Sequence, residues 1–106
     1  MRKTFTKDFE IIVSNGEGSV TTADFLPMKH SSGVVEQIIV DAPSDAATYN
    51  FALTNPDDKL IFNRRSATGN INTDRKLTTI KGTHTISITK GTDGTYVITL
   101  SYNPFW

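Results

Sequence analysis

The stretch THTISITKGTDGTYVITLSY, residues 83–102, decides the fold. It holds two runs in which every second side chain is large and the residues between are mostly threonine or serine. Side chains of a β-strand point alternately to opposite faces, so each run predicts a strand with one buried face and one exposed face. Gly91 and Gly94 lie between the runs and favour a turn. We expect strands over 83–90 and 95–102, paired as a hairpin.

The rest of the chain favours the same kind of structure. Of its 106 residues, 16 are threonine, 10 isoleucine and 6 valine, and such β-branched side chains suit a pleated sheet better than a helix. Turn-forming residues recur at intervals of about 8–12 positions, as they do in sandwiches and barrels. The sequence therefore predicts an all-β fold: an antiparallel, jelly-roll-like β-sandwich of about eight strands.

The same alternation places the other strands. They are expected over residues 5–13, 20–26, 34–41, 48–54, 60–62 and 76–80. The first two should form a hairpin, as should the fourth and fifth, because turn residues join them. Residues 34–41 are apolar on both faces in their second half, which is typical of a central strand. Residues 63–73 show no pattern, so we expect an exposed loop or an irregular edge there.

Length and charge exclude several classes of protein. A chain of 106 residues fits one domain, residues 1–106, without a deep active-site cleft. Its 11 basic and 11 acidic residues cancel, so no charge surplus favours nucleic acid or an anionic membrane as a partner. The absence of cysteine excludes disulfides and a thiolate nucleophile. No stretch has the apolar core of a secretory signal or the length of a membrane span.

The polar residues do not form a recognisable catalytic or metal-binding motif. His30 and His84 lie far apart without carboxylates at ligand spacing, so we expect His84 to be structural and His30 to be solvated. Asp57 and Asp58 follow Asn-Pro, which indicates a solvated turn rather than a calcium site. No Gly-x-Ser-x-Gly motif is present. We therefore expect no enzymatic activity, no cofactor and no metal.

Three groups of residues are candidates for assembly contacts. Arg2 and Lys3 form a basic N-terminal arm, and Arg64 and Arg65 lie in the segment without pattern, where arginines can anchor an interface or simply be solvated. Phe105 and Trp106 form an aromatic C-terminal tail beyond a proline. Rings of this size tend to be buried, either against their own subunit or against a neighbour, and both placements remain open.

Taken as a whole, the chain resembles small virion proteins of tailed bacteriophages, of the capsid decoration (cement) type. The resembling stretches are TFTKDFEIIVSNGEGSVTTADF (4–25), VVEQIIVDAPSDAATYNFALTNPDDKLIFNRR (34–65) and GTHTISITKGTDGTYVITLSY (82–102). No signature motif accompanies the resemblance, so no site residue is transferred from it.

The resemblance implies a non-enzymatic protein that binds the major capsid protein on the outside of the virion. It also implies a homo-oligomer, either a trimer or a dimer, made in the host cytoplasm. Two alternatives remain open. One is a tail, neck or fibre component of the virion. The other is a carbohydrate-binding β-sandwich module, which would need two or three exposed coplanar aromatic rings, whereas Tyr49, Phe51, Tyr96 and Tyr102 are expected to point inward.

Overall fold

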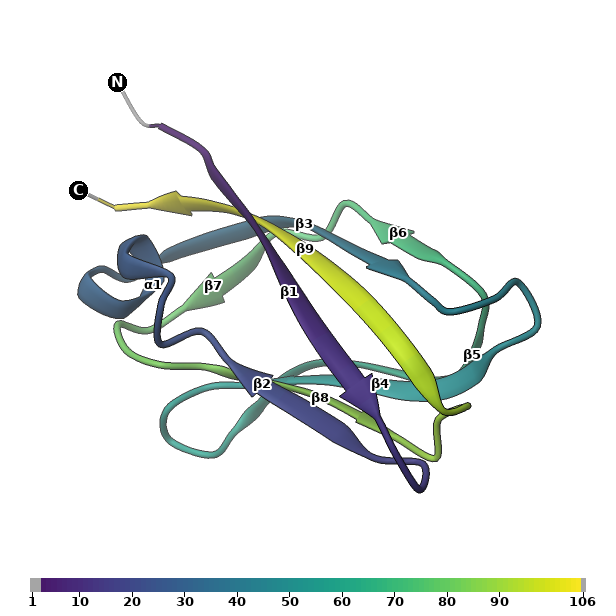
Figure 1. Ribbon diagram of the computed structural model, residues 1–106. Coiled ribbons are helices and arrows are strands. Elements are labelled where there is room, and N and C mark those ends of the chain that lie inside the picture. The colour runs from purple at the N-terminus through teal and green to yellow at the C-terminus, as the bar shows by residue number, and fades with distance from the viewer. Residues whose placement is uncertain (1–2, 106) are drawn as a thin grey trace.

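Two antiparallel sheets form the domain in the computed structural model, which describes residues 3–105 (Figure 1). The elements are β1 Phe5–Val13, β2 Gly18–Thr21, α1 Leu26–His30, β3 Gly33–Asp41, β4 Thr48–Thr54, β5 Leu60–Thr68, β6 Ile71–Thr73, β7 Leu77–Thr79, β8 Thr85–Thr89 and β9 Gly94–Pro104. One sheet has the order β1-β9-β3-β6, with β7 also pairing with β3, and the other has the order β2-β8-β4-β5.

The chain order of the strands is that of a jelly roll. Strands that follow one another in the sequence lie in opposite sheets, except that β4 and β5 share a sheet, as do β6 and β7. β6 and β7 pair with different parts of β3 along the same side, so together they fill one sheet position. Nine strands therefore occupy eight positions, as in a double-sheet jelly roll. The predicted all-β antiparallel sandwich is confirmed.

Alternating side chains from both sheets meet to form the core. The buried row of β9 consists of Tyr96, Ile98, Leu100 and Tyr102, all of them fully buried. It lies between β1 and β3 in its own sheet and faces the buried rows of β4 and β8 in the other sheet. The predictions that the rings of β4 and β9 point inward and that β3 is a central strand are both confirmed.

Three core tyrosines carry their hydroxyl groups to backbone carbonyls of loops. The hydroxyl of Tyr49 donates to the carbonyl of Gly69 at 2.7 Å, and that of Tyr96 donates to Thr92 at 2.8 Å. The hydroxyl of Tyr102 donates to the carbonyl of Ser31 at 2.7 Å. Burial, with Tyr96 close by, raises the pKa of Tyr49 to about 12. The same rings therefore fill the core and hold loops at both ends of the sandwich.

The hairpin predicted over residues 83–102 is wrong, although its two strands exist. β8 pairs with β2 and β4, whereas β9 pairs with β1 and β3 in the other sheet. The connection does not form a hairpin turn, because the amide of Gly91 donates to Gly16 in the β1–β2 turn and the amide of Thr92 donates to Thr48 at the start of β4. The chain thus crosses from one sheet to the other at a point where the sequence suggested a tight turn.

The predicted hairpin of the first two strands is also wrong. β1 and β2 lie in different sheets and are joined only by the bridge between Ser14 and Glu17. The second strand ends at Thr21, residues 22–25 form a turn, and α1 begins at Leu26, the last residue expected in the strand. Pro27 lies in the first turn of this helix, where proline is well tolerated. The predicted β4–β5 hairpin is confirmed.

Of the two interpretations of residues 63–73, the irregular edge is confirmed and the exposed loop is wrong. β5 continues through this segment to Thr68, and β6 follows at Ile71. The alternation is hidden in the sequence because β5 is an edge strand with two irregularities in its pairing to β4. Within it, Ala67 is buried while the residues between Phe62 and Ala67 are exposed.

His84 occupies a buried position at the end of the sandwich that α1 covers. The side chain is fully buried, as predicted for a structural histidine. Its Nδ1 lies 3.1 Å from the carbonyl oxygen of Gly82, and because a carbonyl only accepts, Nδ1 carries the proton. Nε2 has no hydrogen-bond partner among the described residues. Burial lowers the pKa of His84, with the contact to Gly82 opposing the shift.

We predict that acid destabilises this protein through His84. The pKa of His84 is lower in the folded state than its usual value of 6.5, so the unfolded chain binds a proton at a higher pH than the folded protein does. The stability that the neutral ring contributes is therefore fully present above pH 6.5 and is lost as the pH falls toward the folded pKa. The free energy of unfolding, measured with urea from pH 8 to pH 5, should fall by up to about 1.4 kcal/mol per pH unit in that window.

The His84→Gln variant should lack this loss, whatever its stability at pH 8. The matched control is His30→Gln, which changes an exposed residue of α1 and should keep the wild-type pH dependence. An unchanged acid profile in His84→Gln would show that other groups cause it.

Candidate functional site

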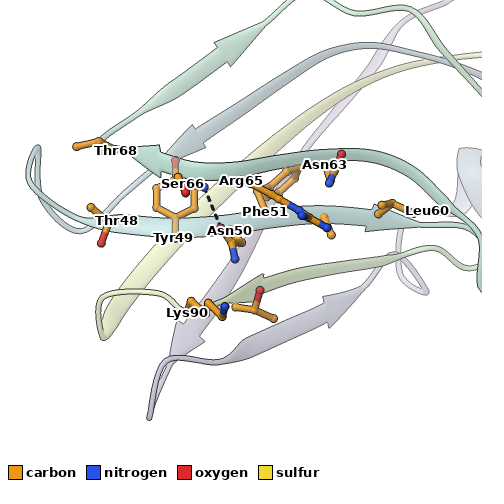
Figure 2. A pocket seen from close by; sticks show the side chains of 12 residues that line it. Thr48, Tyr49, Asn50, Phe51, Leu60, Asn63, Arg65, Ser66, Thr68 and Lys90 are labelled. Carbon is orange, nitrogen blue, oxygen red and sulfur yellow. Dashed lines mark hydrogen bonds between the residues drawn. The ribbon is translucent and has the colours of Figure 1, made fainter.

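A broad groove lies along the outer face of the four-stranded sheet (Figure 2). Its volume is about 840 Å³. It is lined by residues of β4, β5 and β8 and by one residue that follows β8: Thr48, Tyr49, Asn50, Phe51, Ala52, Leu60, Asn63, Arg65, Ser66, Thr68, Thr89 and Lys90. The lining contains two cationic side chains, Arg65 and Lys90, and no acidic residue. An anionic or hydrogen-bonding surface is the kind of partner that this chemistry fits.

A bulge in β5 gives the groove its shape. Phe51 pairs with Arg64 and Tyr49 pairs with Ala67, so Arg65 and Ser66 together lie opposite the single residue Asn50. Ser66 has a φ of 53°, in the left-handed region. Its amide donates to Oδ1 of Asn50 at 2.8 Å, the contact drawn as a dashed line in Figure 2. Asn50 thus provides a hydrogen-bond acceptor for the Ser66 amide, which the bulge takes out of the regular hydrogen bonding between β4 and β5.

The bulge directs the two predicted arginines to different places. Arg65 lines the groove on the outer face. Arg64 instead lies at the edge between the two sheets, where it lines a smaller hollow with Arg75. The guanidinium carbon of Arg75 is 5.9 Å from the centre of the Phe62 ring. Arg64 and Arg65 are therefore neighbours in sequence but not parts of one surface.

Large exposed apolar side chains gather at one end of the sandwich. Four of the five in the described chain belong to the end that holds α1, the β4–β5 turn, the segment after β7 and the end of β9 (Figure 1). We call this group the apolar end, and its members are Leu26, Leu60, Ile80 and Phe105, which are 57%, 54%, 40% and 47% exposed. The fifth, Ile12, lies on the outer face of β1.

Hydrogen bonds join the end of β9 and the segment after β7 to α1 and the residues that follow it, and Gly82 of that segment lies next to Pro56 of the β4–β5 turn. The amide of Phe105 donates to the carbonyl of Ser32 at 2.8 Å, and the amide of Gly82 donates to Met28 of α1 at 3.1 Å. Beside α1, the start of β1 and the residues around Leu26 line an apolar hollow of about 540 Å³. The apolar end is therefore built from segments that are far apart in the sequence.

The candidate residues of the two chain termini are only partly described. Lys3 is exposed, and its Nζ lies 5.4 Å from the ring centre of Phe5, close to the apolar end. Phe105 belongs to the apolar end itself. Arg2 and Trp106 lie outside the described residues. The structure thus places Lys3 and Phe105 near the same end, away from Arg64 and Arg65 in the middle of β5.

Several residues of these surfaces are absent from the sequence-based candidates, among them Leu26, Lys90 and Asn50. Leu26 was expected inside a strand, although Pro27 after it is a recognised signal for the start of a helix. Lys90 was expected to end a strand, and Asn50 had no signal beyond its place on the polar face of β4. Their roles depend on strand neighbours, which alternation does not specify.

Searches for metal-binding and membrane-spanning features give no candidate in the described part of the chain. Between residues 3 and 105, no group of three or more His, Asp or Glu side chains is placed to hold a metal ion. Over the same residues, no helix is long and apolar enough to cross a membrane. Asp57 and Asp58 lie in the β4–β5 turn, where Oδ1 of Asn55 accepts from the amide of Asp57 at 2.9 Å.

Comparison with known proteins supports the fold. No protein-family model and no curated protein matches the chain. Among solved structures, the NLP core of Drosophila, described for pentamer formation and histone binding, is 16% identical with a TM-score of 0.50, over 92% of this chain and 97% of that one.

Two further structures are less similar. The virus-like particle of the extra small virus of the prawn Macrobrachium rosenbergii is 16% identical, with a TM-score of 0.45, over 96% of this chain and 77% of that one. The carbohydrate-binding module CBM36, solved with calcium and xylotriose, is 9% identical, with a TM-score of 0.40, over 96% and 91%. At these identities the similarity concerns the fold alone.

We predict that Asn50 holds the bulge of β5. Asn50→Ala removes the acceptor for the Ser66 amide, so the free energy of unfolding should fall by about 0.5–1.5 kcal/mol and the amide NMR signals of Arg65 and Ser66 should shift. The matched control is Asn63→Ala, which lies in the same groove without a side-chain hydrogen bond to another described residue. Equal losses in both variants would contradict the role of Asn50.

Proposed function

We propose that this protein is a non-enzymatic structural component of a virion, of the decoration type, which binds the major capsid protein on the outside of a tailed-phage capsid. The proposal combines a jelly-roll sandwich, the resemblance of three long stretches to phage decoration proteins, and a surface suited to protein contacts. In this role the protein stabilises the shell because it binds the assembled capsid in preference to free subunits.

The observation that carries the proposal is the apolar end. Isolated exposed apolar residues are common on soluble proteins, but a group of them at one place is typical of a surface that contacts another protein. Leu26, Leu60, Ile80 and Phe105 come from four separate segments and are 40–57% exposed. Burying side chains of this kind on a capsid would contribute about 25 cal/mol for each Å² removed from water.

Two other assignments have less support. A tail, neck or fibre component would share the fold and differ only in its binding partner. A carbohydrate-binding module would need exposed coplanar rings, yet among residues 3–105 Phe105, at 47%, is the only aromatic side chain that is largely exposed. Tyr49 and Phe51, which also line the groove, are each 1% exposed and point into the core.

We predict that the purified chain binds mature heads of the phage that encodes it, prepared without the protein. Binding should be saturable in a co-sedimentation assay. The double variant Leu26→Asp with Phe105→Asp should bind at least tenfold more weakly, because two apolar side chains would become charged at the contact.

The matched control is Ser19→Asp, which adds a charge to an exposed position of β2 and should bind like the wild type. Binding to isolated tails but not to heads would assign the protein to the tail or neck. Binding to neither, together with retention on a glycan array, would overturn the capsid proposal in favour of a carbohydrate-binding module.

A further inference from the structure

The net charge of zero hides an unequal distribution between the two outer faces of the sandwich. On the five-stranded sheet, the outward positions of the described strands carry four acidic side chains and no lysine or arginine. These acidic residues are Asp8, Glu10, Glu36 and Asp41. On the four-stranded sheet, the groove carries Arg65 and Lys90 without an acidic residue.

Strand register shows how the acidic residues are spaced. Val97 of β9 pairs with Glu10 of β1 on one side and with Asp41 of β3 on the other. All three side chains point outward, so two carboxylates flank one apolar side chain. Strands lie about 4.8 Å apart, which puts the two carboxylate positions on the order of 10 Å from each other.

The groove face has a matching arrangement of opposite sign. Arg65 lies on β5 opposite Asn50 of β4, and Asn50 pairs with Thr89 of β8, directly before Lys90. Two cationic residues thus flank a neutral residue across three neighbouring strands, again on the order of 10 Å apart. None of Glu10, Asp41, Arg65 and Lys90 makes an ion pair with another described residue.

We propose that the groove face of one copy docks on the acidic outer face of a second copy, with Arg65 and Lys90 facing Glu10 and Asp41. This contact deepens the homo-oligomer part of the proposed function and rests on it, but it does not involve the capsid. The occupant is a second copy because that copy presents charges of the required sign at the required spacing.

The size of the faces is adequate for such an interface. The molecule measures 40 × 23 × 20 Å, so one face of the sandwich offers an area on the order of the ~800 Å² per partner that standard interfaces bury. Because two different faces meet, the contact is heterologous, and repeated copies form a closed ring or an open chain. The ion pairs also predict an assembly that salt weakens.

Complementary charge reversal tests this contact. The variant Arg65→Glu with Lys90→Glu places acidic side chains on both sides of the contact. The variant Glu10→Lys with Asp41→Lys places lysines at the two positions that face Arg65 and Lys90, so the facing pairs are all basic. Each alone should be monomeric at about 50 µM by sedimentation velocity, because like charges oppose docking. An equimolar mixture should assemble again into species with equal numbers of both variants, because every contact then joins opposite charges.

The control is Lys76→Glu with Lys81→Glu, which makes the same change of charge at exposed positions outside both faces and should keep the wild-type mass. The milder Arg65→Gln with Lys90→Gln should weaken assembly at least tenfold if full reversal impairs folding. The proposal is overturned if the wild type is monomeric, if either reversal variant alone keeps the wild-type mass, or if the mixture stays monomeric.

The head-binding assay separates failure of this contact from failure of the proposed function. If the wild type is monomeric but binds heads, the docking of copies is wrong and the capsid role stands. If Arg65→Glu with Lys90→Glu also loses head binding and mixing does not restore assembly, the groove binds an acidic capsid surface and not a second copy, which overturns the inference.

Discussion

The structure depends on the hydrogen bonds that buried tyrosines make to loop carbonyls. A hydroxyl left without a partner between the sheets would cost about 1–3 kcal/mol, so each ring can fill the core only if a loop carbonyl lies at its tip. Tyr102 satisfies this condition at Ser31, directly after α1, and Tyr49 satisfies it at Gly69, between β5 and β6. The core therefore fixes where the apolar end and the end of the bulged strand lie.

In the strands with regular alternation, the sequence was sufficient to predict which side chains lie inside, whereas the burial of Ala67 in the irregular strand β5 was not predicted. The inward positions of Tyr49, Phe51, Tyr96 and Tyr102 followed directly, as did the two-sheet architecture. Strand partners could not be predicted in the same way. A glycine-containing turn is compatible with a hairpin or with a crossing between sheets, and hydrogen bonds to distant loops, such as that from Gly91 to Gly16, decide between them.

The candidate surfaces were predictable only in part, for a related reason. Phe105 became a candidate because a large aromatic residue is unusual near a chain end, and the structure leaves its ring 47% exposed at the apolar end. Arg64 and Arg65 were candidates together, but they line different hollows because adjacent strand residues point to opposite faces. Lys90 and Arg65 line the same groove because β8, β4 and β5 are neighbours in the sheet, and no local sequence pattern predicts that strand order.

The pairing of β1 with β9 has a consequence for how the protein is made. Residues 5–13 have no partner in their sheet except residues 94–104, and β3 pairs with the same segment on its other side. During synthesis, β1 therefore cannot pair within its sheet until β9 has left the ribosome. Such long-range pairing is typical of slow folders, with times of milliseconds to seconds. Until β9 pairs, the chain exposes β1 and the side of β3 that β6 and β7 do not cover.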